Sequence, residues 1–248
     1  MPFDLTSITA GKICRPPILG IAGVPGIGKT TFAAAAPSPI FIPTEDGSGE
    51  VNVSRFPKAT KLEEVLEAIR TLGTTEHPYQ TVVLDSLDHL EPLIWEYTCR
   101  TNGKASIEAF GYGKGYIEAL TGWRTVFDGL IKLRDRKGMG VIVISHVQVK
   151  RFEDPNSDGY DRYMPKLHKA AADLAVEHCD AWGFANWDIS VVTTTNEDRK
   201  RGVSQGKRII WWEERPSHWA KNRFNLPAKM DLSWAAFNDH MTKTKEGT

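Results

Sequence analysis

Eight consecutive residues near the N-terminus have the spacing of a phosphate-binding loop. They fit the pattern G-x-x-x-x-G-K-[ST] and are Gly23, Val24, Pro25, Gly26, Ile27, Gly28, Lys29 and Thr30. Glycine lets backbone N–H groups face phosphate oxygens, Lys29 adds a positive charge, and the Thr30 hydroxyl suits Mg²⁺. Together with Thr31, which opens the next segment, the loop predicts a binding site for ATP and Mg²⁺.

A second candidate group is the carboxylate of Asp85, which ends the apolar run Val82-Val83-Leu84. An aspartate at the end of a buried strand beside a phosphate-binding loop can hold Mg²⁺, directly or through water. An aspartate here could instead cap the following helix. Given the loop at 23–30, we interpret Asp85 as the second magnesium ligand.

These residues need a sheet with helices around it to position them. Apolar runs without alternation predict buried strands at 18–22, 39–43, 81–85 and 141–144. Between them, apolar spacing and end signals predict helices at 31–36, at 60–73 (a capping box of Thr60 and Glu63, ended by Gly73) and at 116–137. Buried strands separated by helices indicate an α/β fold with a mainly parallel sheet covered on both faces.

The pattern changes beyond residue 180. Short segments rich in aromatic and β-branched residues predict antiparallel strands at 182–187, 190–195, 208–212 and 218–224, with a polar loop at 196–207 and a frayed tail at 241–248. We expect the tryptophans of this region to pack the extension. The expected organisation is one domain over 1–248, with a core at about 17–180 and an antiparallel extension at about 181–230.

Composition narrows the class of protein. The 31 Lys and Arg residues balance the 31 Asp and Glu residues, so nucleic-acid binding would require local basic patches. The three cysteines, Cys14, Cys99 and Cys179, are too widely spaced to suggest a disulfide framework or a metal site. No apolar run approaches the ~18 residues of a membrane span. We therefore expect a cytoplasmic protein without a membrane partner.

On these motifs the chain, over about residues 17–230, resembles phage-type P-loop ATPases with a minimal RecA-like core, a group that includes single-strand annealing and recombination proteins. AAA+ ATPases carry a glutamate directly after the strand-ending aspartate, whereas Ser86 stands there in this chain. In RecA-like ATPases the glutamate ends the neighbouring strand, and the segment 40–45 is similar to that strand. The resemblance implies that Glu45 is the general base or water-positioning residue, although an exposed turn residue is the alternative.

The resemblance implies three further site residues. RecA-like proteins carry a polar side chain that senses the γ-phosphate at the end of a strand, where His146 follows the run 141–144 here, although a strand-end histidine can be a core residue. Their oligomers project two cations into the neighbouring subunit's site from a strand similar to 220–227, so Lys221 and Arg223 would complete that site in trans. Ordinary surface charges on an edge strand are the alternative reading of this pair.

The resemblance also implies two loops that bind single-stranded DNA, corresponding here to 100–114 and 148–169. Both mix cations with aromatic rings, which suits phosphates and unstacked bases. The candidate DNA-binding cations are Lys104, Lys114, Lys150, Arg151, Arg162 and Lys166. Solvated surface loops are the alternative, and the acidic residues of the second loop favour it.

The function implied is an Mg²⁺-dependent ATPase of DNA recombination or repair that forms a ring or filament of identical subunits on single-stranded DNA, in the host cytoplasm if a phage encodes it. A single-strand binding protein is a further expected partner. Three alternatives stay open at this point: a hexameric helicase-like translocase, a nucleoside or nucleotide kinase, and a non-catalytic nucleotide-gated adaptor. A phosphate-binding loop alone does not distinguish among them.

Overall fold

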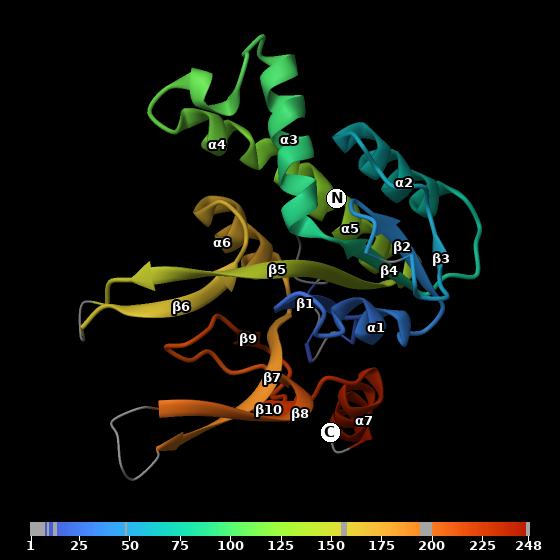
Figure 1. Cartoon of the computed structure of the whole chain (residues 1–248). Coiled ribbons are helices and arrows are strands. Elements are labelled where there is room, and N and C mark those ends of the chain that lie inside the picture. The colour runs from blue at the N-terminus through green and yellow to red at the C-terminus, as the bar shows by residue number, and fades with distance from the viewer. Residues whose placement is uncertain are drawn as a thin grey trace.

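The computed structural model describes residues 8, 10–11, 14–47, 49–154, 158–193 and 200–246, with the backbone alone for 190–193, 200–205 and 244–246. Its described strands form one ten-stranded sheet (Figure 1). Their order in the main path is β10-β8-β7-β1-β5-β4-β2-β3, whereas β6 pairs with β5 and β9 pairs with β7. The strands are β1 (Ile18–Gly23), β2 (Pro39–Pro43), β3 (Ser54–Arg55), β4 (Thr81–Asp85), β5 (Gly140–Phe152), β6 (Tyr160–Pro165), β7 (Ala181–Thr193), β8 (Lys200–Trp211), β9 (Lys221–Asn222) and β10 (Lys229–Asp231).

The central strands are parallel, and the C-terminal ones are not. From β7 through β1, β5, β4 and β2 to β3 every pairing is parallel, whereas β8, β10 and β9 pair antiparallel. All residues of β1 and β4 are buried, which explains why their sequences show no alternation of apolar and polar residues. The α/β fold with a C-terminal antiparallel extension is therefore confirmed.

Helices cover both faces of this sheet (Figure 1). One buried cluster joins the sheet to α2 (Leu62–Thr74), α3 (Leu87–Thr101), α5 (Leu120–Lys137) and α6 (Lys169–His178). The second cluster joins the opposite face to α1 (Lys29–Ala34) and α7 (Trp234–Glu246). The parallel strands end on one edge, called here the carboxyl edge, which is where ligands bind in open α/β sheets. The opposite edge is called the amino edge.

Several predicted helix boundaries are wrong. The carboxylate that caps α2 belongs to Glu64, which accepts hydrogen bonds from the backbone N–H groups of Thr60 and Lys61, and Gly73 lies inside the helix. The predicted helix 116–137 is two helices, α4 (Lys114–Glu118) and α5, that meet at Ala119. The sequence predicted no helix at α3, which contains Pro92.

The extension also differs from its prediction. Strands predicted at 182–187 and 190–195 are one continuous strand, β7, as far as Thr193, and part of the predicted loop 196–207 belongs to β8. Residues 194–199 lie outside the described part of the chain. The tail predicted to fray is helical in α7 through Glu246, because Phe237 packs into the second buried cluster. No helix in the described ranges combines the length and the apolar character needed to cross a membrane.

Candidate active site

The phosphate-binding loop connects the carboxyl end of β1 to α1. Gly26 and Gly28 have φ angles of 72° and 105°, a backbone region that favours glycine. Gly23 is required for a different reason, since a Cβ atom there would lie 2.4 Å from the carbonyl oxygen of Ala185 on β7. The predicted strand, loop and helix are therefore present in the predicted order, with Lys29 and Thr30 opening α1.

Lys29 folds back over the loop. Its ammonium group donates hydrogen bonds of 3.1 Å to the carbonyl oxygens of Gly23 and Val24, and the residue is buried. Burial lowers the pKa of Lys29, while the nearby carboxylates of Asp85, Asp88 and Glu45 oppose the change. The loop thus holds a cation close to three acidic groups.

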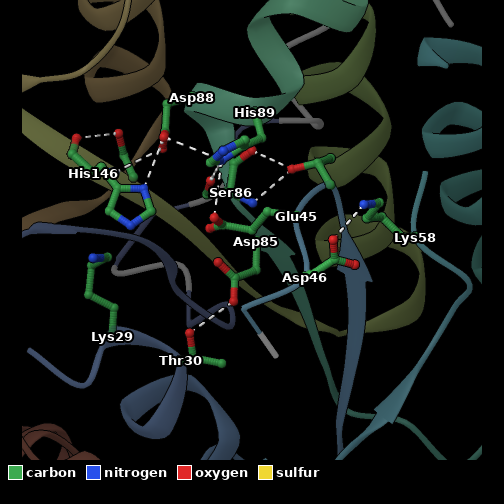
Figure 2. A network of polar contacts seen from close by, with 12 residues as sticks. Lys29, Thr30, Glu45, Asp46, Lys58, Asp85, Ser86, Asp88, His89 and His146 are labelled. Atoms are coloured by element: carbon green, nitrogen blue, oxygen red, sulfur yellow. Dashed lines mark hydrogen bonds and ion pairs between the residues drawn. The ribbon is translucent and has the colours of Figure 1, made fainter. Parts of the chain in front are cut away.

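Thr30 and Asp85 face each other across the loop (Figure 2). The Thr30 hydroxyl donates a 3.0 Å hydrogen bond to Oδ2 of Asp85. The other oxygen, Oδ1, is buried and has no hydrogen-bond partner among the described residues. Burial raises the pKa of Asp85 to about 6, and the bond from Thr30 opposes this rise. A hydroxyl beside a buried carboxylate with an unpaired oxygen fits the oxygen ligands that Mg²⁺ prefers.

Glu45 follows β2, which lies directly beside β4, with Pro43 opposite Asp85. Thr44 fixes the two strand ends together: its hydroxyl donates 2.7 Å to the carbonyl oxygen of Ser86 and accepts 2.8 Å from the Ser86 N–H. The Glu45 carboxylate is close enough to Asp85 to raise its pKa by charge repulsion, after the larger effect of burial. The structure therefore brings Glu45 to the same sheet edge as the phosphate-binding loop (Figure 2).

His146 lies on β5, between the loop strand β1 and the Asp85 strand β4, opposite Gly23. Asp88 lies near the start of α3 and accepts two hydrogen bonds from His146, one from the backbone N–H and one from ring Nδ1, each 2.9 Å long. Burial alone would raise the pKa of Asp88, but the hydrogen bonds and charges of His146 and His89 outweigh it and lower the value to about 2. An ionised Asp88 thus holds the orientation of the His146 ring.

Sequence reasoning missed His89, which lies on α3 beside Glu45. Its Nδ1 is 3.2 Å from Glu45 Oε2, 2.9 Å from Ser86 Oγ and 3.4 Å from Asp88 Oδ2. One ligand atom from each of Glu45, His89 and His146 lies within 4.8 Å of the others. Spacing along the chain gives no signal for His89, because Asp85 ends β4 and the helix that carries His89 begins at Leu87.

Arg208 is a second residue that sequence reasoning missed. It lies on β8, and its Nη1 atom is 2.8 Å from the position that a Cβ on Gly28 would take. Its guanidinium group also lies over the ring of Trp187, 6.0 Å from the centroid. The group forms no ion pair with any residue that the structure describes. The hairpin β7–β8 thus brings an exposed cation to the phosphate-binding loop.

Lys221 and Arg223 lie at the amino edge of the sheet, near the first residues of β7 and away from the phosphate-binding loop of their own chain. The Lys221 ammonium donates to the carbonyl oxygens of Val176 and Glu177 at 2.8 and 2.7 Å. Arg223 lies 3.7 Å from Asp180 and follows the two-residue strand β9, so the predicted alternation within one strand is absent. The pair therefore contributes nothing to the nucleotide site of its own chain.

The predicted DNA-binding cations differ in exposure, and the second predicted segment is not a loop. The segment 148–169 is largely the β5–β6 hairpin, and not a loop, although residues 155–157 lie outside the description. Arg162 is buried, pairs with Glu214 at 2.5 Å and donates to the His218 carbonyl oxygen, so its charge is used internally. The other predicted cations are exposed: Lys104, Lys114, Lys150, Arg151 and Lys166.

The chain is similar to a solved structure and to a family model. Among solved structures, a similar one is entitled "Crystal structure of the RadB recombinase", with 14% identity, 79% of this chain and 80% of that chain covered, and a TM-score of 0.43. No curated protein matches the sequence. A family model described as "AAA domain" matches residues 15–224, which is most of the chain. The chain therefore belongs to this AAA domain family of P-loop proteins.

Proposed function

We propose that the protein hydrolyses ATP, in a reaction that depends on Mg²⁺, and acts in DNA recombination or repair. ATP hydrolysis is supported by the convergence of Lys29, Thr30, Asp85 and Glu45 at one sheet edge. The hydrogen bond from Thr44 to Ser86 holds the segments that carry Glu45 and Asp85 together. A loop, a metal-binding carboxylate and a second carboxylate are the parts that γ-phosphate hydrolysis requires.

Each residue has a separate task in this proposal. The backbone of residues 23–31 and the Lys29 ammonium bind the phosphates. Thr30 and Asp85 hold Mg²⁺, which would neutralise charge on the β- and γ-phosphates. Glu45 orients a water molecule and accepts its proton, and His146, held by Asp88, contacts the γ-phosphate. Arg208 adds a cation from the same chain.

The DNA part of the proposal is supported by the exposed cations on two segments, 100–114 and 148–169, which are joined by a ring contact just beyond the end of the first segment. Tyr116 of α4 stacks on His168, which follows β6, with ring centroids 4.3 Å apart. Lys104 lies over the Phe110 ring, and Tyr112 is fully exposed. Cations beside exposed rings suit a single strand, whose phosphates and bases they would contact. We further propose that identical subunits assemble on this strand as a ring or filament.

The test of hydrolysis is Glu45→Gln, which keeps the size of the side chain and removes its basicity. We expect the hydrolysis rate to fall about 100-fold or more while ATP binding persists. Asp46→Asn is the matched control, because Asp46 is exposed and pairs with Lys58. Hydrolysis by Glu45→Gln at the normal rate would contradict the proposed base.

The test of DNA binding is fluorescence anisotropy of a labelled single-stranded oligonucleotide. We expect Lys150→Ala/Arg151→Ala to weaken binding and to reduce its salt dependence, because each lost phosphate contact removes released counterions. Lys132→Ala/Arg136→Ala, which removes two exposed cations from α5, is the control. Equal effects of both pairs would contradict a specific DNA surface.

Assembly is tested by the dependence of the hydrolysis rate on protein concentration. If Lys221 and Arg223 act in a neighbouring subunit, Arg223→Ala lowers the rate only at concentrations at which subunits associate. A rate that is proportional to concentration throughout, with and without oligonucleotide, would remove both residues from the proposal.

A further inference from the structure

The two histidines near Glu45 form a cluster that water activation does not need. Glu45 follows β2, His89 belongs to α3, and His146 belongs to β5, so three separate elements meet there. One ligand atom from each lies within 4.8 Å of the others, and Figure 2 shows the three side chains close together. Their side chains are 20%, 46% and 20% exposed, so an ion can reach them from solvent.

The hydrogen bonds around the cluster leave Nε2 of His146 available as a ligand, whereas Nδ1 of His89 contacts the Ser86 hydroxyl, which a bound ion would displace. Because Asp88 accepts from Nδ1 of His146, the proton of the neutral ring is on Nδ1, and Nε2 keeps its lone pair. A carboxylate that accepts from the second nitrogen of a ring is the usual support of a metal-binding histidine. His89 Nδ1 and Glu45 Oε2 are 3.2 Å apart, which is a normal separation for two ligands of one ion.

The chemistry of the ligands separates this cluster from the magnesium site. Thr30 and Asp85 offer oxygen atoms only, whereas two imidazoles and one carboxylate suit Zn²⁺ and related transition-metal ions. We propose that Glu45, His89 and His146 form a second cation site, for a Zn²⁺-class ion, beside the phosphate-binding loop. Three protein ligands leave a coordination position open.

Occupation of this site has a consequence that rests on the proposed function. Glu45 cannot bind the ion and accept a proton from water with the same electron pairs. A bound ion therefore inhibits hydrolysis but leaves the phosphate contacts of Lys29 and the loop intact. The site would make the ATPase sensitive to transition metals at concentrations that do not displace Mg²⁺ from Thr30 and Asp85.

The direct test uses Co²⁺ alone as the probe, on the full chain without nucleotide or Mg²⁺. We expect one Co²⁺ per chain, with visible absorption bands that Zn²⁺ abolishes. His89→Ala and Glu45→Gln should each weaken binding at least 10-fold, and Asp88→Asn should weaken it about 10- to 100-fold by releasing the His146 ring. His77→Ala, which removes a histidine on the connection from α2 to β4, should change nothing.

His89 is half exposed, so its replacement should not unfold the protein, and circular dichroism would verify this. Absence of the Co²⁺ bands, or bands of equal strength in His89→Ala, overturns the metal site. The second measurement is hydrolysis with added Zn²⁺: inhibition in the wild type and its loss in His89→Ala support the site. If Glu45→Gln hydrolyses ATP normally but loses Co²⁺, the proposed base is wrong and the metal site stands.

Discussion

The two edges of the sheet carry similar charged residues, but these residues differ in how many partners they have within the chain. At the amino edge, Asp180 lies 3.5 Å from Arg134 and 3.7 Å from Arg223, and also accepts a hydrogen bond from the Ile18 N–H. At the carboxyl edge, one oxygen of Asp85 has no partner among the described residues. Arg208 likewise forms no ion pair with a carboxylate of any described residue. Charges that are satisfied within the chain stabilise it, whereas unsatisfied ones are available to a ligand.

The strongest test of this difference replaces one aspartate at each edge by asparagine. Asp85→Asn should lower the rate of ATP hydrolysis by about 100-fold or more, because the metal loses its charged ligand. The free energy of unfolding of this variant should not fall, because burial of the Asp85 carboxylate without a partner for Oδ1 is itself costly. The measurements are steady-state hydrolysis and urea unfolding of the same preparation.

Asp180→Asn should do the reverse. Loss of the charge weakens the contacts to Arg134 and Arg223, and we expect the free energy of unfolding to fall by about 1–3 kcal/mol. The hydrolysis rate per folded chain should be unchanged at concentrations at which subunits do not associate. If both substitutions reduced hydrolysis and stability together, the two edges would not have separate roles.

A smaller effect is expected at β8, where neighbouring cations lie on opposite faces of one strand. Arg208→Ala should weaken ATP binding by about 10- to 100-fold, which is the effect of one charge-assisted hydrogen bond to phosphate. Lys207→Ala is the matched control, because Lys207 pairs with Asp231 at 2.7 Å. Isothermal titration with ATP measures both, and equal affinities would show that Arg208 does not reach the nucleotide.

The sequence predicted some residues of the carboxyl edge and missed others, for a physical reason. A phosphate-binding loop fixes the conformation of Gly26 and Gly28 locally, and Asp85 follows from one buried strand. The positions of His89 and Arg208 depend instead on how α3 and the β7–β8 hairpin pack, which involves residues more than 40 positions from the loop. Spacing along the chain carries no information on such contacts.

The same limit applies to the predicted DNA-binding residues. Arg162 and Lys150 are cross-strand partners on β6 and β5, and both are cations with an aromatic residue within two positions in the sequence. Only the tertiary structure shows that Glu214 neutralises Arg162 while Lys150 stays exposed. A basic and aromatic composition therefore predicts a surface of this kind without identifying its members.

Replacement of Lys221 at the amino edge should change the free energy of unfolding by about 1 kcal/mol. Its ammonium group binds two carbonyl oxygens at the last turn of α6, where a cation is favourable. Lys221→Ala should lower the free energy of unfolding by about 1 kcal/mol. Lys169→Ala, at the first residue of the same helix, is the control. A loss of hydrolysis at high protein concentration without a loss of stability would favour the contact in trans.

A further effect of about the same size concerns the extension and its response to acid. His218 is buried against Phe184, with Nε2 3.2 Å from the Glu213 carbonyl oxygen, and burial lowers its pKa to about 4. Between pH 6.5 and about 4 the unfolded chain binds a proton at this residue and the folded chain does not, so acid favours unfolding. His218→Gln cannot titrate, and urea unfolding at pH 7 and pH 4.5 should show a smaller acid-induced loss in the variant, by about 1 kcal/mol after allowance for solvent screening. An equal loss of stability in both proteins would mean that the His218 ring is protonated in the folded state at pH 4.5. The extension would then hold a positive charge without a fixed partner, as the carboxyl edge does at Arg208.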